Sequence, residues 1–197
     1  MPSLKRPAKP SSDRILVAAE ALFASKGYAD VSLRQLIAAA GVSTTAFYAR
    51  FPSKAAVLEK LTETLFAELH VEAAAVLRQA RNLDEGIKRG IDLVVDHFGP
   101  RKALVRLIIS EAGSVPSVLL KRRQSYLMLA MFLARYLRAL DERRVITCKD
   151  PETVAWALVG ALEMQFVRWA VWGDLPDAQL TAALRMSAHA ILPKEHS

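Results

Sequence analysis

Apolar residues recur at helical spacing along almost the whole chain. Near its start, Ile15, Ala18, Ala19, Leu22 and Phe23 are spaced so that all five lie on one face of a helix. Glycine, proline and serine interrupt this pattern at intervals, and no segment shows the two-residue alternation typical of a strand. The sequence therefore predicts an all-α protein.

Helix boundaries follow from the same pattern and its breaks. After the first helix, which Gly27 ends, and two short helices, we expect further helices at Ser53–Ala80, Asp84–Phe98, Arg101–Ala112, Pro116–Glu142, Pro151–Trp172 and Pro176–Leu192. Their grouping predicts three parts: a flexible basic arm over residues 1–12, a domain of short helices over 13–58, and a larger helical domain over 59–197.

The two short helices have strong signals at their ends. Ser32 and Gln35 have the spacing of a capping box, in which each side chain satisfies a backbone N–H at the start of a helix. Gly41 suits the left-handed residue that ends this helix, and Ser43 then caps the next one. Two short helices joined by a glycine-containing turn predict a helix-turn-helix.

Positive charge is concentrated in the same part of the chain. The 197 residues carry a formal net charge of +7. Through Lys60 there are nine basic and four acidic residues, a net charge of +5, whereas the remaining 137 residues carry +2. This distribution indicates a polyanionic partner, either nucleic acid or an acidic membrane surface.

Side chains suited to DNA open and follow the second short helix. Its first residues offer small hydroxyls for phosphates and base edges and a methyl for thymine, namely Ser43, Thr44, Thr45 and Ala46. Donors able to reach phosphate oxygens come next, namely Tyr48, Arg50 and Lys54.

Two cations are expected at helix starts, where the helix dipole disfavours them. Arg34 and Lys54 lie in the first turns of their predicted helices, at a cost of about 0.3–1 kcal/mol each. A phosphate bound at each helix start would make the interaction favourable. The alternative is that both side chains are surface residues whose long stems turn away from the dipole.

The segment from Val31 to Lys54 resembles the DNA-binding region of TetR-family transcriptional repressors. Gly41-Val42-Ser43, the aromatic pair Phe47-Tyr48 and Ser53-Lys54 carry the resemblance, which spans about 14–61. The family has three N-terminal DNA-binding helices followed by a helical effector-binding and dimerisation domain. The resemblance implies phosphate contacts for Ser32, Tyr48 and Lys54, and groove-facing positions for Thr44, Thr45 and Ala46.

This chain departs from the family pattern at three places. Ile37 stands where the family usually has alanine, and Arg50 where histidine or tyrosine is common. Thr44-Thr45 replaces a frequent basic-glycine pair, which leaves the base preference open.

The last two predicted helices indicate a homodimer. The helix from Pro151 to Trp172 is apolar nearly all round and must be covered on most sides. We expect it to pair with the last helix and with their counterparts in a second copy, through Ala157, Gly160, Ala161, Leu180, Leu184, Ala188 and Ile191. The alternative is that these residues form an internal three-helix core.

A small effector would bind between the helices of the body in a mostly apolar pocket. The candidate lining residues are Phe66, His70, His97, Phe98, Met128, Phe132, Trp156 and Trp169, for each of which the alternative is a place in the ordinary core. No cofactor and no metal site are expected. The single cysteine, Cys148, excludes a disulfide framework and is either a redox-sensing thiol or an incidental surface residue.

These observations favour a cytoplasmic, non-enzymatic, ligand-responsive repressor that binds a palindromic DNA operator as a homodimer. A helical metal-dependent enzyme is one alternative, but the paired Glu-x-x-His motifs it needs do not occur. A nonspecific DNA-binding protein is another. A membrane-surface protein is disfavoured, because the first helix uses two alanines where a bulky apolar face is needed.

Overall fold

The computed structural model describes residues 10–111 and 115–194, and its regular elements in this part of the chain are all helical. The predicted fold class is confirmed, and each predicted helix is present with its ends displaced by no more than a few residues. Most of the predicted arm falls on residues 1–9, which lie outside the described residues.

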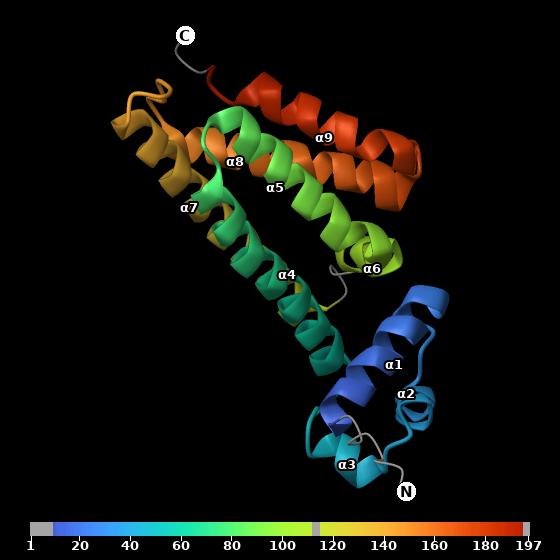
Figure 1. Ribbon diagram of the computed structural model, residues 1–197. Helices are drawn as coiled ribbons and strands as arrows, with labels where there is room; N and C mark the ends of the chain where they lie inside the picture. The colour runs from blue at the N-terminus through green and yellow to red at the C-terminus, as the bar shows by residue number, and fades with distance from the viewer. Residues whose placement is uncertain (1–9, 112–114, 195–197) are drawn as a thin grey trace, which may run out of the picture.

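Three short elements form the N-terminal unit: α1 (Ser11–Lys26), α2 (Leu33–Ala40) and α3 (Thr44–Tyr48). Figure 1 shows them gathered at one end of a long fourth helix. Ile15 and Phe23 from α1 are buried together with Val31, Leu36 and Phe47. This small core fixes the angle between α2 and α3.

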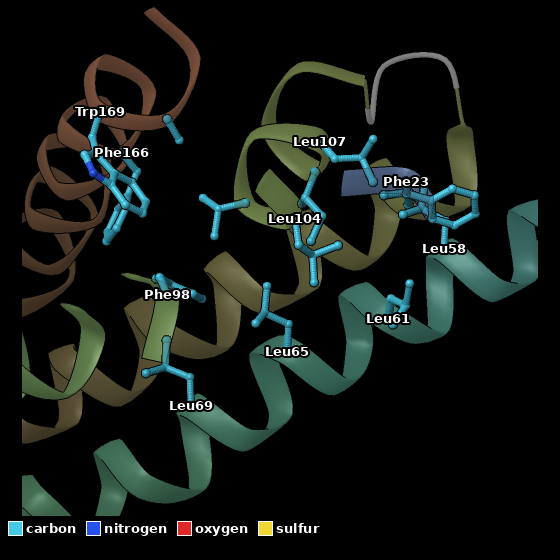
Figure 2. Close-up of a cluster of buried hydrophobic side chains, with 14 of the residues drawn as sticks. Phe23, Leu58, Leu61, Leu65, Leu69, Phe98, Leu104, Leu107, Phe166 and Trp169 are labelled. Carbon is cyan, nitrogen blue, oxygen red and sulfur yellow. The ribbon is translucent and has the colours of Figure 1, made fainter. Parts of the chain in front are cut away.

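The long helix α4 (Lys54–Gln79) passes from this unit into the rest of the molecule. It runs without a break through the predicted domain boundary at residues 58 and 59. Leu58, Leu61, Leu65 and Leu69 occupy successive turns of one buried face, which Figure 2 shows. The first two leucines lie nearer the N-terminal unit and the last two in the body, so one helix serves both cores.

The body contains α5 (Leu83–Phe98), η1 (Gly99–Arg101), α6 (Lys102–Glu111), α7 (Pro116–Glu142), α8 (Pro151–Phe166) and α9 (Asp177–Ile191). Helix α7 packs against both α4 and α8, and α9 packs against α8 and α5. Gly86 of α5 allows a close approach to α7, because a Cβ there would lie 2.6 Å from the hydroxyl oxygen of Tyr136.

A continuous apolar core joins the N-terminal unit to the body. Helix α6 packs against α1, and Figure 2 shows Leu107 of α6 beside Phe23 of α1, with Leu104 of α6 above Leu65 of α4. At its edge, the guanidinium of Arg101 lies 3.0 Å from the Glu68 carboxylate and 3.8 Å from that of Glu20. A displacement of α6 would therefore act directly on α1 through these contacts.

The predicted helix Pro151–Trp172 is α-helical only to Phe166. Residues Val167–Trp172 (η3) form a π-helical segment, which Gly173 ends with a φ of +72°. Trp169 is buried there, and its indole N–H donates to Asp177 Oδ1 at 2.7 Å. The apolar pattern contains no signal for this wider turn.

Candidate nucleic-acid interface and effector pocket

The start of α2 has the hydrogen bonds that the sequence predicts. Ser32 Oγ accepts from the backbone N–H of Gln35 at 3.2 Å, and Gln35 Oε1 accepts from the N–H of Ser32 at 2.8 Å. The capping box is confirmed. It leaves Ser32 at the surface, with Arg34 exposed in the first turn of α2.

The turn into α3 also follows the predicted geometry. Gly41 has a φ of +61°, in the left-handed region, and ends α2. Ser43 Oγ then accepts from the N–H of Ala46 at 3.1 Å and caps α3. Because these bonds join residues three apart, the local sequence is sufficient to specify them.

Burial of one residue orients α3. Phe47 is fully buried, and its ring contacts those of Tyr48 and Phe51 edge-on or tilted. With Phe47 turned inward, Thr44 and Thr45 are exposed at the start of the helix, Ala46 is half-buried and Tyr48 is exposed. Arg50 is exposed just beyond the helix. The predicted DNA-contacting residues other than Lys54 are therefore exposed or half-buried around α3 and at the start of α2.

Lys54 is placed differently from Arg34. Its ammonium donates to the carbonyl oxygens of Tyr28 and Val31, each at 2.7 Å, and lies 4.2 Å from the centre of the Tyr28 ring. Burial raises the pKa of the Tyr28 phenol. Lys54 therefore ties the α1–α2 loop to the start of α4, and its predicted phosphate contact stays a prediction.

Arg14 is a basic residue near this surface that the sequence interpretation did not select. It lies in the first turn of α1, and its Nη1 is 3.9 Å from the position that a Cβ on Gly41 would occupy. Only the packing of α1 against the turn reveals this proximity, because the two residues are far apart in the sequence.

The body contains two adjoining pockets between its helices. The first, with a cavity volume of about 80 Å³, lies between α4, α5, α6, α7 and α8. The second, with a cavity volume of about 100 Å³, lies between α4, α5, α7, α8 and α9. Leu69, Val94, Leu129 and Leu162 line both pockets and so form the partition between them.

Three of the predicted effector-binding residues line these pockets: Phe66 and Phe98 the first, and Phe132 the second. His70 stacks on Phe66 but does not itself line the first pocket, and burial lowers the pKa of its imidazole. His97 Nε2 lies 2.8 Å from the carbonyl oxygen of Leu65. Neither histidine lines a pocket.

The other three predicted effector-binding residues do not line these pockets. Met128 and Trp156 point outward and are 56% and 46% exposed, while Trp169 is buried beside Asp177 and lines neither pocket. Each lies on a helix that also contributes pocket residues, but on another face. The spacing of aromatic residues identified the helices and not their orientation.

The predicted dimer residues are exposed or half-buried on α8 but mostly buried on α9. Ala157 and Gly160 are exposed and Ala161 is half-buried on α8. On α9, however, Leu180, Leu184 and Ala188 are buried within the protomer, and Ile191 is half-buried. The predicted α9 stripe is therefore wrong as an interface, because α5 and α8 already cover it.

An apolar surface remains on the outer faces of α8, η3 and α9. Trp156, Met164, Trp172 and Met186 are 46%, 47%, 63% and 73% exposed there, and Gly160 is exposed on the same face of α8 as Trp156 and Met164. By length and composition, Pro151–Trp172 is also the one helix in the described part of the chain that could cross a membrane, although core helices of soluble proteins pass the same test.

Cys148 is neither of the residues that the sequence suggested. It is buried, its backbone N–H donates to Asp141 Oδ1 at 3.0 Å, and burial with the nearby Asp141 charge raises the pKa of its thiol. A raised pKa disfavours the reactive thiolate. Among residues 10–111 and 115–194, no group of three or more His, Cys, Asp or Glu side chains is arranged to hold a metal ion.

Comparison with known proteins agrees with the helix-turn-helix. The sequence model of the bacterial regulatory proteins of the tetR family matches residues 15–61. The regulator EthR of Mycolicibacterium smegmatis is 34% identical over 110 residues, which cover 53% of this chain and 51% of EthR. The chain thus spans about half the length of this curated relative. Residues 15–61 therefore have the DNA-binding region of TetR-family regulators.

Longer but weaker similarities extend the TetR-family match to the body. The nucleoid occlusion factor SlmA of Aliivibrio fischeri is 28% identical over 169 residues, which cover 83% of this chain and 86% of SlmA. A structure from Syntrophomonas wolfei, assigned to the TetR family, superposes with a TM-score of 0.82 at 20% identity, covering 92% of this chain and 94% of that one. The fold of the body is therefore a TetR-family fold.

Proposed function

We propose that this chain is a transcriptional repressor of the TetR family that binds a palindromic operator as a homodimer and is released by a small apolar effector. The observation that carries the proposal is the exposed, doubly capped α2–α3 unit, which shares a core with a helical body containing two apolar pockets. We further propose that it acts in the cytoplasm and is not an enzyme.

In this proposal α3 enters the major groove. Thr44, Thr45 and Ala46 face base edges, because they open α3, where Thr44 and Thr45 are exposed and Ala46 is half-buried. Contacts to phosphates come from the surrounding surface, namely from Ser32, Arg34, Ser43, Tyr48, Arg50 and, as an addition from the structure, Arg14. Lys54 supports this surface through the α1–α2 loop.

A second copy of the chain would cover the apolar surface on α8, η3 and α9. Tryptophans and methionines with this much exposure are unusual on a monomer. A Cβ built on Gly160 has no atom within 4 Å, so a partner helix has room to approach closely there. Two-fold pairing would place two α3 helices about 34–36 Å apart, one helical turn of DNA.

Effector release would act through α6. Val105 and Ile108 of α6 line the first pocket, while Leu104 and Leu107 of the same helix face α1 and α4. A ligand that favours a shifted α6 would move α1 and change the spacing of the two reading helices.

The test is a fluorescence-anisotropy titration of the full-length protein against the DNA upstream of its own gene, at several salt concentrations. We expect affinity for one duplex to exceed that for a scrambled duplex, and a steep loss of affinity with salt. Thr44→Ala should reduce the preference for the specific duplex. Arg78→Ala, an exposed change on α4 in the body, serves as the control.

Equal affinity for specific and scrambled duplexes would contradict the proposal and favour a nonspecific DNA-binding protein. A monomer at micromolar concentration in sedimentation equilibrium would contradict the dimer.

A further inference from the structure

The first pocket is apolar except for one polar corner. Its lining residues with polar side chains are Ser125 and Tyr126 of α7 and Glu163 of α8. They are brought together where α7 packs against α8. A single polar corner in an apolar pocket gives a ligand one orientation and a preferred head group.

The hydroxyl hydrogens of this corner are already used within the protein. Ser125 Oγ donates to the carbonyl oxygen of Lys121 at 3.0 Å, and the Tyr126 hydroxyl donates to Glu163 Oε1 at 2.7 Å. A serine or tyrosine hydroxyl has only one hydrogen to donate. Burial and the Glu163 carboxylate raise the pKa of Tyr126, so this hydroxyl keeps its hydrogen.

The neighbouring cation, Arg122, is held by the backbone of α6 and pairs with Glu163. Arg122 Nη1 lies 3.3 Å and 3.1 Å from the carbonyl oxygens of Ile108 and Ile109, and Arg122 Nη2 lies 3.7 Å from Glu163 Oε1. Arg122 itself does not line the pocket. Both contacts of Glu163 therefore use Oε1, and within the described part of the chain Oε2 is left as an acceptor beside the pocket.

We infer that the effector is an elongated apolar molecule whose one polar end is a hydrogen-bond donor, with an ammonium preferred over a hydroxyl and a carboxylate disfavoured. The inference rests on the proposed effector pocket and names the class of ligand it takes. An ammonium would form a charge-assisted hydrogen bond with Glu163. A carboxylate would meet a second carboxylate in an apolar setting, with each hydroxyl hydrogen already donated.

The second pocket accommodates the apolar end. It adjoins the first across the four residues of the partition, and its lining is aliphatic or aromatic apart from the Tyr136 hydroxyl and two glycines. A ligand held at Glu163 would extend its chain past Leu69 and Leu162.

The experiment uses three probes with the same ten-carbon chain: decylamine, decanol and decanoate. Isothermal titration calorimetry with the full-length protein, below the micellar concentrations, measures their dissociation constants. We expect decylamine to bind at least about tenfold more tightly than decanoate, with decanol between them. In Glu163→Gln the ratio of amine to decanoate should fall to about threefold or less, while decanol binding changes little.

Two features keep this test specific. The glutamine oxygen still accepts from Tyr126, so the pocket wall is preserved, and an unchanged unfolding temperature of Glu163→Gln checks this. Glu72→Gln, an exposed change on α4, alters the net charge by the same amount as Glu163→Gln. It should leave the ratio of dissociation constants unaltered.

The inference is overturned if decanoate binds as tightly as decylamine, or if Glu163→Gln retains the preference for the amine. It stands without the proposed function if the amine preference is observed but the protein binds no specific duplex. If the protein binds its operator and no probe binds, the repressor proposal survives and the ligand inference fails.

Discussion

The N-terminal unit and the body are both built from α-helices, but the residues that form their sites are separated by different distances along the chain. In the α2–α3 unit, the bonds that set the geometry join Ser32 to Gln35 and Ser43 to Ala46, three residues apart. In the body, the polar corner of the pocket joins Tyr126 to Glu163, thirty-seven residues apart. A local site can be recognised from a short stretch of sequence, whereas a distant one depends on helix packing.

The largest expected effect distinguishes the two faces of α9. Leu184→Ala removes a fully buried side chain, and we expect the free energy of unfolding to fall by about 2–5 kcal/mol. Met186→Glu, two residues away and 73% exposed, should instead weaken the proposed dimer and leave protomer packing intact.

Urea unfolding measures the first of these effects and sedimentation equilibrium the second. If the Leu184→Ala dimer dissociates while the free energy of unfolding is unchanged, Leu184 belongs to the dimer interface after all.

The next effect distinguishes Lys54 from Arg34. Lys54→Met leaves the carbonyl oxygens of Tyr28 and Val31 without this donor, and we expect a loss of about 1–3 kcal/mol in stability. Arg34→Ala should leave stability unchanged and reduce the slope of log affinity against log salt concentration by about 1. Thermal unfolding and DNA titrations at four salt concentrations measure both. A reduced salt slope with unchanged stability in Lys54→Met would restore its phosphate role.

A smaller effect tests the local geometry of the turn. Gly41→Ala places a Cβ on a residue with a φ of +61° and should cost about 1–2 kcal/mol. Gly41→Asn should cost less, because asparagine tolerates this region better. Chemical unfolding compares the two variants, and equal stability of Gly41→Ala and the parent would show that the turn relaxes.

The smallest effect concerns pH and lies in the body. Burial lowers the pKa of His70 in the folded state, so the unfolded chain binds the proton more readily. Stability is therefore full above the ordinary histidine pKa and decreases as the pH falls through it toward the lower folded value. His70→Gln should flatten this dependence in urea unfolding between about pH 5 and 8. An unchanged dependence would assign it to other groups.

The sequence by itself determined the all-α fold class, the helix boundaries to within a few residues, and the caps of α2 and α3. Helical periodicity and capping act between residues three or four apart, so their signals are complete in a short segment. The resemblance of Val31–Lys54 to the TetR family rests on the same local residues.

Only the tertiary structure decided which face of each long helix meets a pocket, the core or the surface. Met128 and Leu129 are neighbours on α7, yet Leu129 lines both pockets and Met128 is exposed, because α4 and α8 determine what each face contacts. For the same reason Lys54 donates to carbonyl oxygens of the α1–α2 loop, and Glu163 accepts from Tyr126. Residues far away in the chain determine these positions, so the spacing of residues along one helix does not predict them.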